Sequence, residues 1–195
     1  MNSSHSRGRV LDTSNFAHPV RNVGALGIQP GMVVADFGSG SGAYVLAIGA
    51  LLAHDGRVYA VDVQKDLLRR THNEAKKRGL NSVHILWGDL EHPHGSKLAD
   101  QSCDLVLISN LLFQVENKSA VLREARRILR PRGRLAIVDW EDSFGGMGPI
   151  PEQVVSKDSA IELCEHAGFR FQDEFAAGAH HYGLILRGIR DSDHV

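Results

Sequence analysis

Short apolar runs alternate with helical segments along most of this sequence, and the alternation restricts the folds that the chain can adopt. The runs are solid stretches of β-branched and aliphatic residues, which are typical of strands buried on both faces. The expected strands are 32–35, 57–61, 83–86, 104–109 and 134–139, and the expected helices are 42–53, 65–78 and 118–130. Pro131 and Gly133 are expected to end the last of these helices. This order predicts a doubly wound α/β fold with a mostly parallel sheet.

The carboxyl-terminal part of the chain departs from this alternation. A helix is expected over 156–167, and strand-like runs follow at 169–175 and 180–187. Only the four residues 176–179 separate these two runs, and four residues cannot hold a crossover helix. The last two strands therefore form a hairpin, and we expect a seven-stranded, mostly parallel sheet with an antiparallel last strand.

Nothing in the sequence divides the chain into several domains. It has 195 residues and no repeat or low-complexity tract. A chain of this length can bury one core without disulfide or metal staples. We place a single domain at residues 15–188, between flexible segments at 1–14 and 189–195.

Charge and composition argue against several classes of partner. The net charge of −1 gives little attraction to nucleic acid or an anionic membrane, and the arginines within 126–134 fit the end of a helix. No apolar run is long enough for a signal peptide or a membrane span. Cys103 and Cys164 form no CxxC pair, and the eleven histidines lack the spacing of a metal motif. We therefore expect a cytoplasmic protein with no metal, no nucleic-acid partner and no membrane partner; its oligomeric state stays open.

A glycine-rich stretch follows the first expected strand. Residues 33–43 read VVADFGSGSGA, with glycines at alternate positions. Glycine lets a ligand lie against main-chain N–H groups at the start of a helix, and ligands of such sheets bind beyond the carboxyl ends of the strands. A turn without a ligand needs only one such glycine. The spacing also fits the dinucleotide fingerprint GxGxxG/A, so the glycines alone do not identify the ligand.

Acidic residues follow three successive expected strands. Asp62 comes twenty residues after Gly42, where a carboxylate can accept both hydroxyls of an adenosine ribose. Asp89 is suited to an exocyclic amine such as that of adenine. Asp36 precedes the first glycine of the loop, where its charge would repel a pyrophosphate and attract a cation. The three acids together favour an adenosine that carries positive charge.

With these residues, the sequence resembles the class I S-adenosylmethionine-dependent methyltransferases from about residue 15 to residue 188, and most of all the methyltransferase type 11-like branch. Asp36-x-Gly38-x-Gly40-x-Gly42 matches the first motif of the family, Gly88-Asp89-Leu90 its adenine-contacting segment, and 129–135 its turn into the fifth strand. The resemblance implies S-adenosyl-L-methionine as the cofactor. The implied cofactor-binding residues are Asp36, Gly38, Ser39, Gly40, Gly42, Asp62, Val63, Gly88, Asp89, Leu90 and Asn110.

The resemblance implies methyl transfer to a small-molecule acceptor. The branch includes quinone-biosynthesis C-methyltransferases and arsenite methyltransferases, but the latter need a set of thiols that the two cysteines are not placed to supply. Residues 109–112 lack the NPPY-type segment of amino-directed DNA and protein enzymes, and no Pro-Cys nucleophile occurs. Two alternatives stay open. One is an NAD(P)-dependent oxidoreductase, although no Tyr-x-x-x-Lys pair is present, and the other is a noncatalytic S-adenosylmethionine-binding partner subunit.

The acceptor is expected where the fourth, fifth and reversed strands meet. The candidate catalytic residues are Asp139, His180 and His181, and the candidate substrate contacts are Phe16, His18, Phe113 and Trp140. Neighbours on a strand face opposite sides, so one of the two histidines must point away, and Asp139 could instead cap a loop. Trp140 is as well suited to the core as to a substrate platform. Residues 16–19 are expected to start a lid helix, and 143–151 to form a mobile substrate loop.

Overall fold

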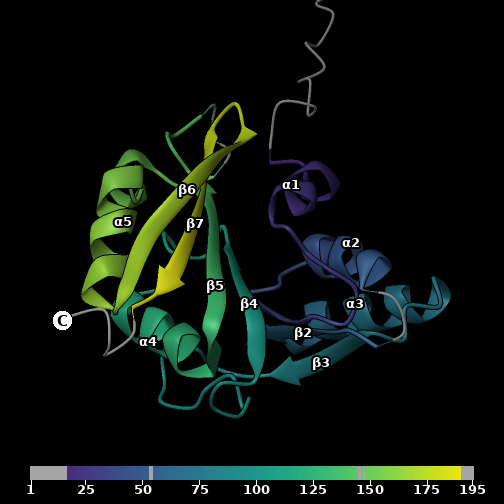
Figure 1. Cartoon of the computed structure of the whole chain (residues 1–195). Helices are drawn as coiled ribbons and strands as arrows, with labels where there is room; N and C mark the ends of the chain where they lie inside the picture. The colour runs from purple at the N-terminus through teal and green to yellow at the C-terminus, as the bar shows by residue number, and fades with distance from the viewer. Residues whose placement is uncertain (1–16, 53–54, 145, 147, 190–195) are drawn as a thin grey trace, which may run out of the picture.

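The computed structural model describes residues 17–52, 55–144, 146 and 148–189. These residues form a seven-stranded sheet with the strand order β3-β2-β1-β4-β5-β7-β6 (Figure 1). The strands are β1 (Val33–Phe37), β2 (Arg57–Asp62), β3 (Val83–Trp87), β4 (Cys103–Ser109), β5 (Leu129–Trp140), β6 (Phe169–Gly178) and β7 (His181–Gly188). The first five strands pair in parallel, and β7 runs antiparallel to both β5 and β6. The predicted doubly wound sheet and its reversed last strand are confirmed.

Helices pack on both faces of the sheet (Figure 1). They are α1 (Pro19–Ala25), α2 (Ala43–Leu51), α3 (Lys65–Lys77), α4 (Lys118–Ile128), α5 (Lys157–His166) and the short 3-10 helix η2 (Pro151–Gln153). Alternate strand residues supply two apolar clusters: Val34 and Leu105 join side chains of α1, α2 and α3, while Ala35 and Val106 join those of α4 and α5. The sheet is therefore covered on both faces, as the solid apolar runs predict.

Two boundaries differ from the sequence-based expectation. Helix α4 ends at Ile128 and β5 begins at once, so the expected stop at Pro131 and Gly133 lies inside the strand. Residues 130–133 bulge out between Leu129, which pairs with Cys103, and Arg134, which pairs with Leu105. A bulge tolerates proline because the missing N–H is not needed for pairing there.

The second difference is the length of the hairpin. Strand β6 extends to Gly178, so the turn is made by 179–180 and not by 176–179. His180 therefore lies in the turn, and β7 begins at His181. Loop length alone predicted the topology correctly, but the predicted strand was shorter than the observed β6.

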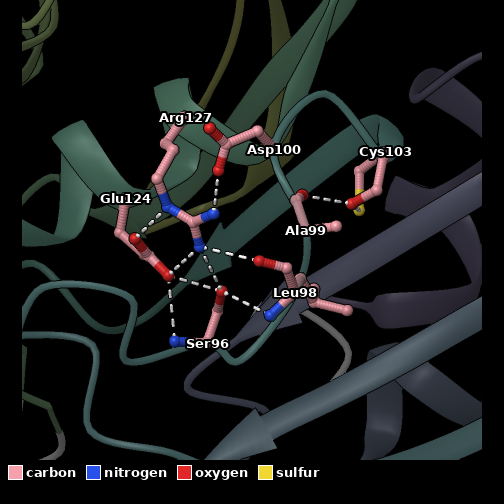
Figure 2. Close-up of polar contacts among 8 residues, drawn as sticks. Ser96, Leu98, Ala99, Asp100, Cys103, Glu124 and Arg127 are labelled. Atoms are coloured by element: carbon pink, nitrogen blue, oxygen red, sulfur yellow. Dashed lines mark hydrogen bonds and ion pairs between the residues drawn. The ribbon is translucent and has the colours of Figure 1, made fainter.

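A buried ion pair fixes the connection between β3 and β4 to helix α4 (Figure 2). The Glu124 carboxylate is 4% exposed and accepts hydrogen bonds from the Ser96 N–H, the Ser96 hydroxyl and the Arg127 guanidinium. Arg127 also donates to the Leu98 carbonyl oxygen at 2.9 Å and pairs with Asp100. The connection that carries the acid after β3 is thus held to the helix by a satisfied polar network.

We predict that Glu124→Ala lowers the free energy of unfolding by about 3–5 kcal/mol, because it leaves Arg127 and the Ser96 N–H without their buried partner. The control is Glu74→Ala, which removes an exposed pair with Arg78 on α3 and should change stability little. Urea unfolding of both variants measures the difference. Equal losses would show that burial adds nothing to the Glu124 pair.

Candidate active site at the carboxyl ends of the strands

Two adjoining cavities, each of about 240 Å³, open beyond the carboxyl ends of the parallel strands. The Asp62 cavity is lined by residues that include Asp62, Val63, Gly88, Asp89 and Leu90. The Asp36 cavity is lined by residues that include Asp36, Ser39, Tyr44, Ser109 and Asn110. Gly38, Gly40 and Gln114 line both. One elongated ligand can therefore occupy the two cavities together.

The loop between β1 and α2 separates the cavities and is shaped by glycine. Gly40 has a φ of 51°, in the left-handed region, and a side chain built there would meet almost nothing. Gly42 has a φ of 78° and precedes α2; a Cβ there would lie 2.4 Å from Thr71 atoms. Gly42 is required by packing and lines neither cavity, whereas Gly40 leaves its backbone open to a ligand.

Asp62 holds this loop to the end of β2. Its carboxylate is buried and accepts hydrogen bonds from the Gly40 N–H and the Gln64 N–H, each at 2.8 Å. Each carboxylate oxygen has a second lone pair that can accept from a ligand hydroxyl. Asp62 therefore shapes the loop and still presents acceptor capacity to its cavity.

Asp36 is buried against the same loop without such support. It is 1% exposed, and its Oδ1 atom has no hydrogen-bond partner among the described residues. Burial, and second the nearby charge of Asp62, raise the pKa of Asp36 to about 8. The sequence predicts a fixed negative charge at Asp36, but with a pKa of about 8 the carboxyl is mostly protonated at neutral pH. A bound cation would lower this pKa and restore the charge.

Further unpartnered polar atoms lie on the Asp36 cavity. Within the described part of the chain, the Ser39 hydroxyl and the Asn110 Oδ1 atom are buried without a hydrogen-bond partner. Asn110 also has a φ of 51°, an uncommon conformation for a residue other than glycine. Buried polar groups are normally satisfied, so these atoms fit a ligand with several polar groups. The predicted cofactor has such polar groups at its amino acid end.

The remaining predicted cofactor residues line the Asp62 cavity. Asp89 accepts a hydrogen bond from the Glu91 N–H at 3.0 Å and lies 3.0 Å from the His92 ring nitrogen, and Leu90 is buried. Val63 is 54% exposed at the cavity rim. The structure therefore brings all the predicted cofactor residues together except Gly42. Tyr44 and Gln114 also line these cavities and are not among the predicted residues. A tyrosine in an otherwise aliphatic helix next to the loop is the signal that could have identified Tyr44.

The two candidate histidines have different surroundings. His181 is 4% exposed and packs against Trp140 with the rings tilted by 40° and their centroids 4.2 Å apart. Neither of its ring nitrogens has a partner in the described structure, and burial together with the nearby His180 lowers its pKa to about 4. His180 lies in the turn, with Nδ1 2.8 Å from Asp142 Oδ1 and its ring stacked on Phe144. His181 is therefore neutral at physiological pH.

Asp139 caps the turn that follows β4. Its buried carboxylate accepts hydrogen bonds from the Leu112 N–H at 3.0 Å and the Trp140 N–H at 2.8 Å. Burial raises its pKa to about 6, although the backbone donors oppose the shift. Asp139 therefore makes the contacts of a loop cap, which was the alternative to a catalytic role in the sequence analysis.

The acceptor-side candidates lie apart from the two cavities. Phe113 is half-buried and His18 is exposed, and neither lines the Asp36 or the Asp62 cavity, although Ala17 and Pro19 beside His18 line the Asp36 cavity. Trp140, Asp139, His180 and His181 line neither of them within the described chain. Phe16 lies outside the described residues. Within those residues, no group of side chains is arranged to hold a metal ion, and no helix has the length and apolarity to cross a membrane.

Comparisons with known proteins agree on one family. The family described as "Methyltransferase domain" matches residues 28–183. The sequence is 27% identical over 137 residues to an arsenite methyltransferase of Halobacterium salinarum, covering 70% of this chain and 33% of the relative. It is 29% identical over 114 residues to the ubiquinone/menaquinone biosynthesis C-methyltransferase UbiE of Hydrogenovibrio crunogenus, covering 58% of this chain and 44% of the relative. The chain thus spans less than half the length of either relative.

A solved structure is similar over nearly its whole length. The crystal structure of a SAM dependent methyltransferase from Aquifex aeolicus superposes with a TM-score of 0.81 at 26% sequence identity. The match covers 90% of this chain and 92% of that one. The similarity therefore includes the reversed last strand as well as the strands that carry the acids.

We predict that Asp36→Asn stabilises the ligand-free chain in a pH-dependent way. The folded pKa of Asp36 is raised to about 8, so the native state binds its proton more tightly than the unfolded state does. The stability that the protonated carboxyl contributes is complete below about pH 4 and is lost as the pH rises toward 8. The variant should match the parent near pH 4 and exceed it by roughly 2–4 kcal/mol at pH 7. Urea unfolding across this range measures the difference.

Asp66→Asn, at an exposed position on α3, is the control and should give a constant offset. A constant difference between Asp36→Asn and the parent at every pH would contradict the buried, proton-binding state of Asp36.

Proposed function

Because this chain belongs to the class I S-adenosylmethionine-dependent methyltransferase family, we propose that it transfers the methyl group of S-adenosyl-L-methionine to a small-molecule acceptor. The observation that carries the proposal is the pair of adjoining cavities, with an acid at or just beyond the carboxyl end of each of three strands and unpartnered polar atoms in the Asp36 cavity. The experiment that tests it is incubation of the protein with isotopically labelled cofactor and a metabolite extract, followed by a search for mass-shifted products. Failure to form S-adenosylhomocysteine with any extract would favour the noncatalytic partner subunit.

Each cavity suits one end of the cofactor. The Asp62 carboxylate accepts the ribose hydroxyls, and Asp89 and Leu90 contact the adenine. Asp36, Ser39 and Asn110 then meet the amino acid end, whose ammonium group suits a carboxylate. The cationic ligand compensates the buried Asp36, which a dinucleotide pyrophosphate would not do. This charge pattern and the family assignment favour the methyltransferase over the nicotinamide oxidoreductase.

The chain contributes mainly by positioning. Bound S-adenosylmethionine supplies an electrophilic methyl group on its sulfonium, and the protein holds an acceptor in line with it. Holding two reactants in this way accounts for roughly 7–11 kcal/mol of a barrier. The loop tied by Asp62 and the ionised Asp36 fix the cofactor side of this geometry. A base is needed only where the acceptor must lose a proton.

The acceptor side favours a small, neutral or weakly polar molecule. Arg126 and Arg130, from the basic cluster, are held by the Ile189 carbonyl oxygen and the Asp104 carboxylate, which leaves them poorly placed for phosphates. Cys103 and Cys164 are fully buried, and burial raises their pKa values to about 11 and about 12. They supply no thiolate for the chemistry named in the arsenite relative. A carbon or hydroxyl nucleophile is the better match.

Of the three candidate bases we favour His181, whose neutral ring can accept a proton although its low pKa makes it a weak base. It is neutral at physiological pH, its nitrogens are unpartnered among the described residues, and its ring packs against Trp140. His180 is already bonded to Asp142, and Asp139 caps two backbone amides. We therefore assign His181 and Trp140 to the acceptor, with His180 and Asp139 as the weaker candidates.

We predict that Asp62→Ala weakens S-adenosylhomocysteine binding by about 10- to 100-fold, since charge-assisted hydrogen bonds of about 1.5–3 kcal/mol are lost. Isothermal titration calorimetry on the folded variant measures this. Asp66→Ala, four residues on and exposed on α3, is the control and should bind like the parent. Unchanged affinity in Asp62→Ala, or tighter binding of NADH than of S-adenosylhomocysteine to the parent, would contradict the assignment.

We predict that His181→Ala lowers turnover of the identified acceptor by about 100-fold or more if that acceptor is deprotonated in the reaction. Cofactor affinity should be retained. His180→Ala is the matched control, because it removes the same side chain from the neighbouring position, and it should keep most of the activity. Full activity in both variants would remove the histidines from the mechanism.

A further inference from the structure

One buried amide connects three elements around the Asp36 cavity. Asn22 of α1 is 1% exposed, and its Nδ2 atom donates to the Tyr44 hydroxyl oxygen and to the Ala177 carbonyl oxygen, each at 2.9 Å. Tyr44 belongs to α2 and Ala177 to the end of β6. A single side chain therefore fixes α1 both to the helix behind the glycine loop and to the hairpin.

Helix α1 depends on such contacts for its position. It has only seven residues, and a helix this short is not stable without tertiary packing. Within the described chain, its N-cap residue His18 makes no side-chain capping bond, while Val23 and Leu26 bury its apolar side. Ala17 and Pro19 line the Asp36 cavity. The position of α1 therefore sets one wall of that cavity.

The Tyr44 hydroxyl can donate a hydrogen bond at the same wall. Its oxygen accepts from Asn22, so the hydrogen of the phenol is not used in that bond. Burial raises the pKa of Tyr44, although hydrogen bonds to Asn22 and Ser109 oppose the shift, and the phenol stays protonated. Tyr44 lines the cavity with Asp36 and Ser109. A neutral donor beside a carboxylate that suits an ammonium group matches the two ends of an amino acid zwitterion.

We propose that Asn22 is a positioning residue that holds α1 closed over the Asp36 cavity and orients the Tyr44 hydroxyl, which donates a hydrogen bond to the carboxylate of the bound cofactor. The proposal rests on the proposed function, because it takes S-adenosylmethionine as the ligand. It adds two residues that no motif of the family identifies in this sequence. It also links cofactor binding to closure of α1.

The test compares two ligands that differ in the amino acid end. S-adenosylhomocysteine carries the carboxylate, and 5′-methylthioadenosine carries the adenosine without it. Tyr44→Phe and Asn22→Ala should each bind S-adenosylhomocysteine about 5- to 10-fold more weakly than the parent, the effect of one hydrogen bond. Their binding of 5′-methylthioadenosine should match the parent. Tyr59→Phe on β2 removes the same atom elsewhere, and Val20→Ala changes the exposed face of α1; both should bind like the parent.

Hydrogen exchange gives the second readout. S-adenosylhomocysteine should slow exchange of the α1 amides in the parent but not in Asn22→Ala. Parent-like affinity for S-adenosylhomocysteine in both variants, or equal weakening toward both ligands, would overturn the proposal. Tyr44→Phe keeps the ring in the core, so it decides the question even if Asn22→Ala fails to fold. A parent chain that binds neither ligand would overturn the proposed function itself.

Discussion

The carboxylate of Asp62 is the interaction on which the site depends. It accepts one N–H from the loop after β1 and one from the segment after β2, each at 2.8 Å. These bonds hold the glycine loop in a left-handed course between the two cavities. Parallel pairing of β1 with β2 brings the two segments to the same edge of the sheet. The ligand site therefore follows from the sheet topology together with one acid, and the remaining residues refine it.

At the same edge of the sheet, the buried carboxyl of Asp36 lowers the stability of the fold. A buried carboxyl with an unpartnered oxygen among the described residues is unfavourable in the ligand-free chain, and its raised pKa expresses that penalty. Glu124 is also buried, but Arg127 and Ser96 satisfy it fully. The difference fits the proposed function: the partner of Glu124 is part of the fold, whereas we propose that the partner of Asp36 arrives with the ligand. Strain and unpaired groups of this kind concentrate at binding sites.

The strands, the reversed last strand and the grouping of most predicted cofactor residues around two cavities were predictable because they depend on local pattern and chain order. Solid apolar runs identify the strands, and an acid that ends a parallel strand must lie at the ligand edge. The contact between Asn22 and Ala177 joins residues 155 positions apart and leaves no periodic trace. At Pro131 the sequence predicted a turn that ends the helix, but the structure has a bulge within β5. This difference also comes from contacts distant in sequence, because strand pairing overrode the local stop signal. Contacts between residues distant in sequence determine the features that the local sequence pattern does not predict.

The reversed strand explains why the proposed acceptor side is harder to predict than the proposed cofactor side. A parallel strand presents its last residue at the ligand edge, but β7 presents its first, and the pairing of Trp140 with His181 joins the end of β5 to the start of β7. The hairpin turn lies at this edge as well, so Ala177 meets α1 while His180 meets Asp142. The cofactor side is built from strand ends that share one motif, whereas the acceptor side combines a hairpin, a short helix and a connecting loop. Changes in these three segments can alter the acceptor while the bonds of Asp62 stay intact, which is how one fold accommodates many methyl acceptors.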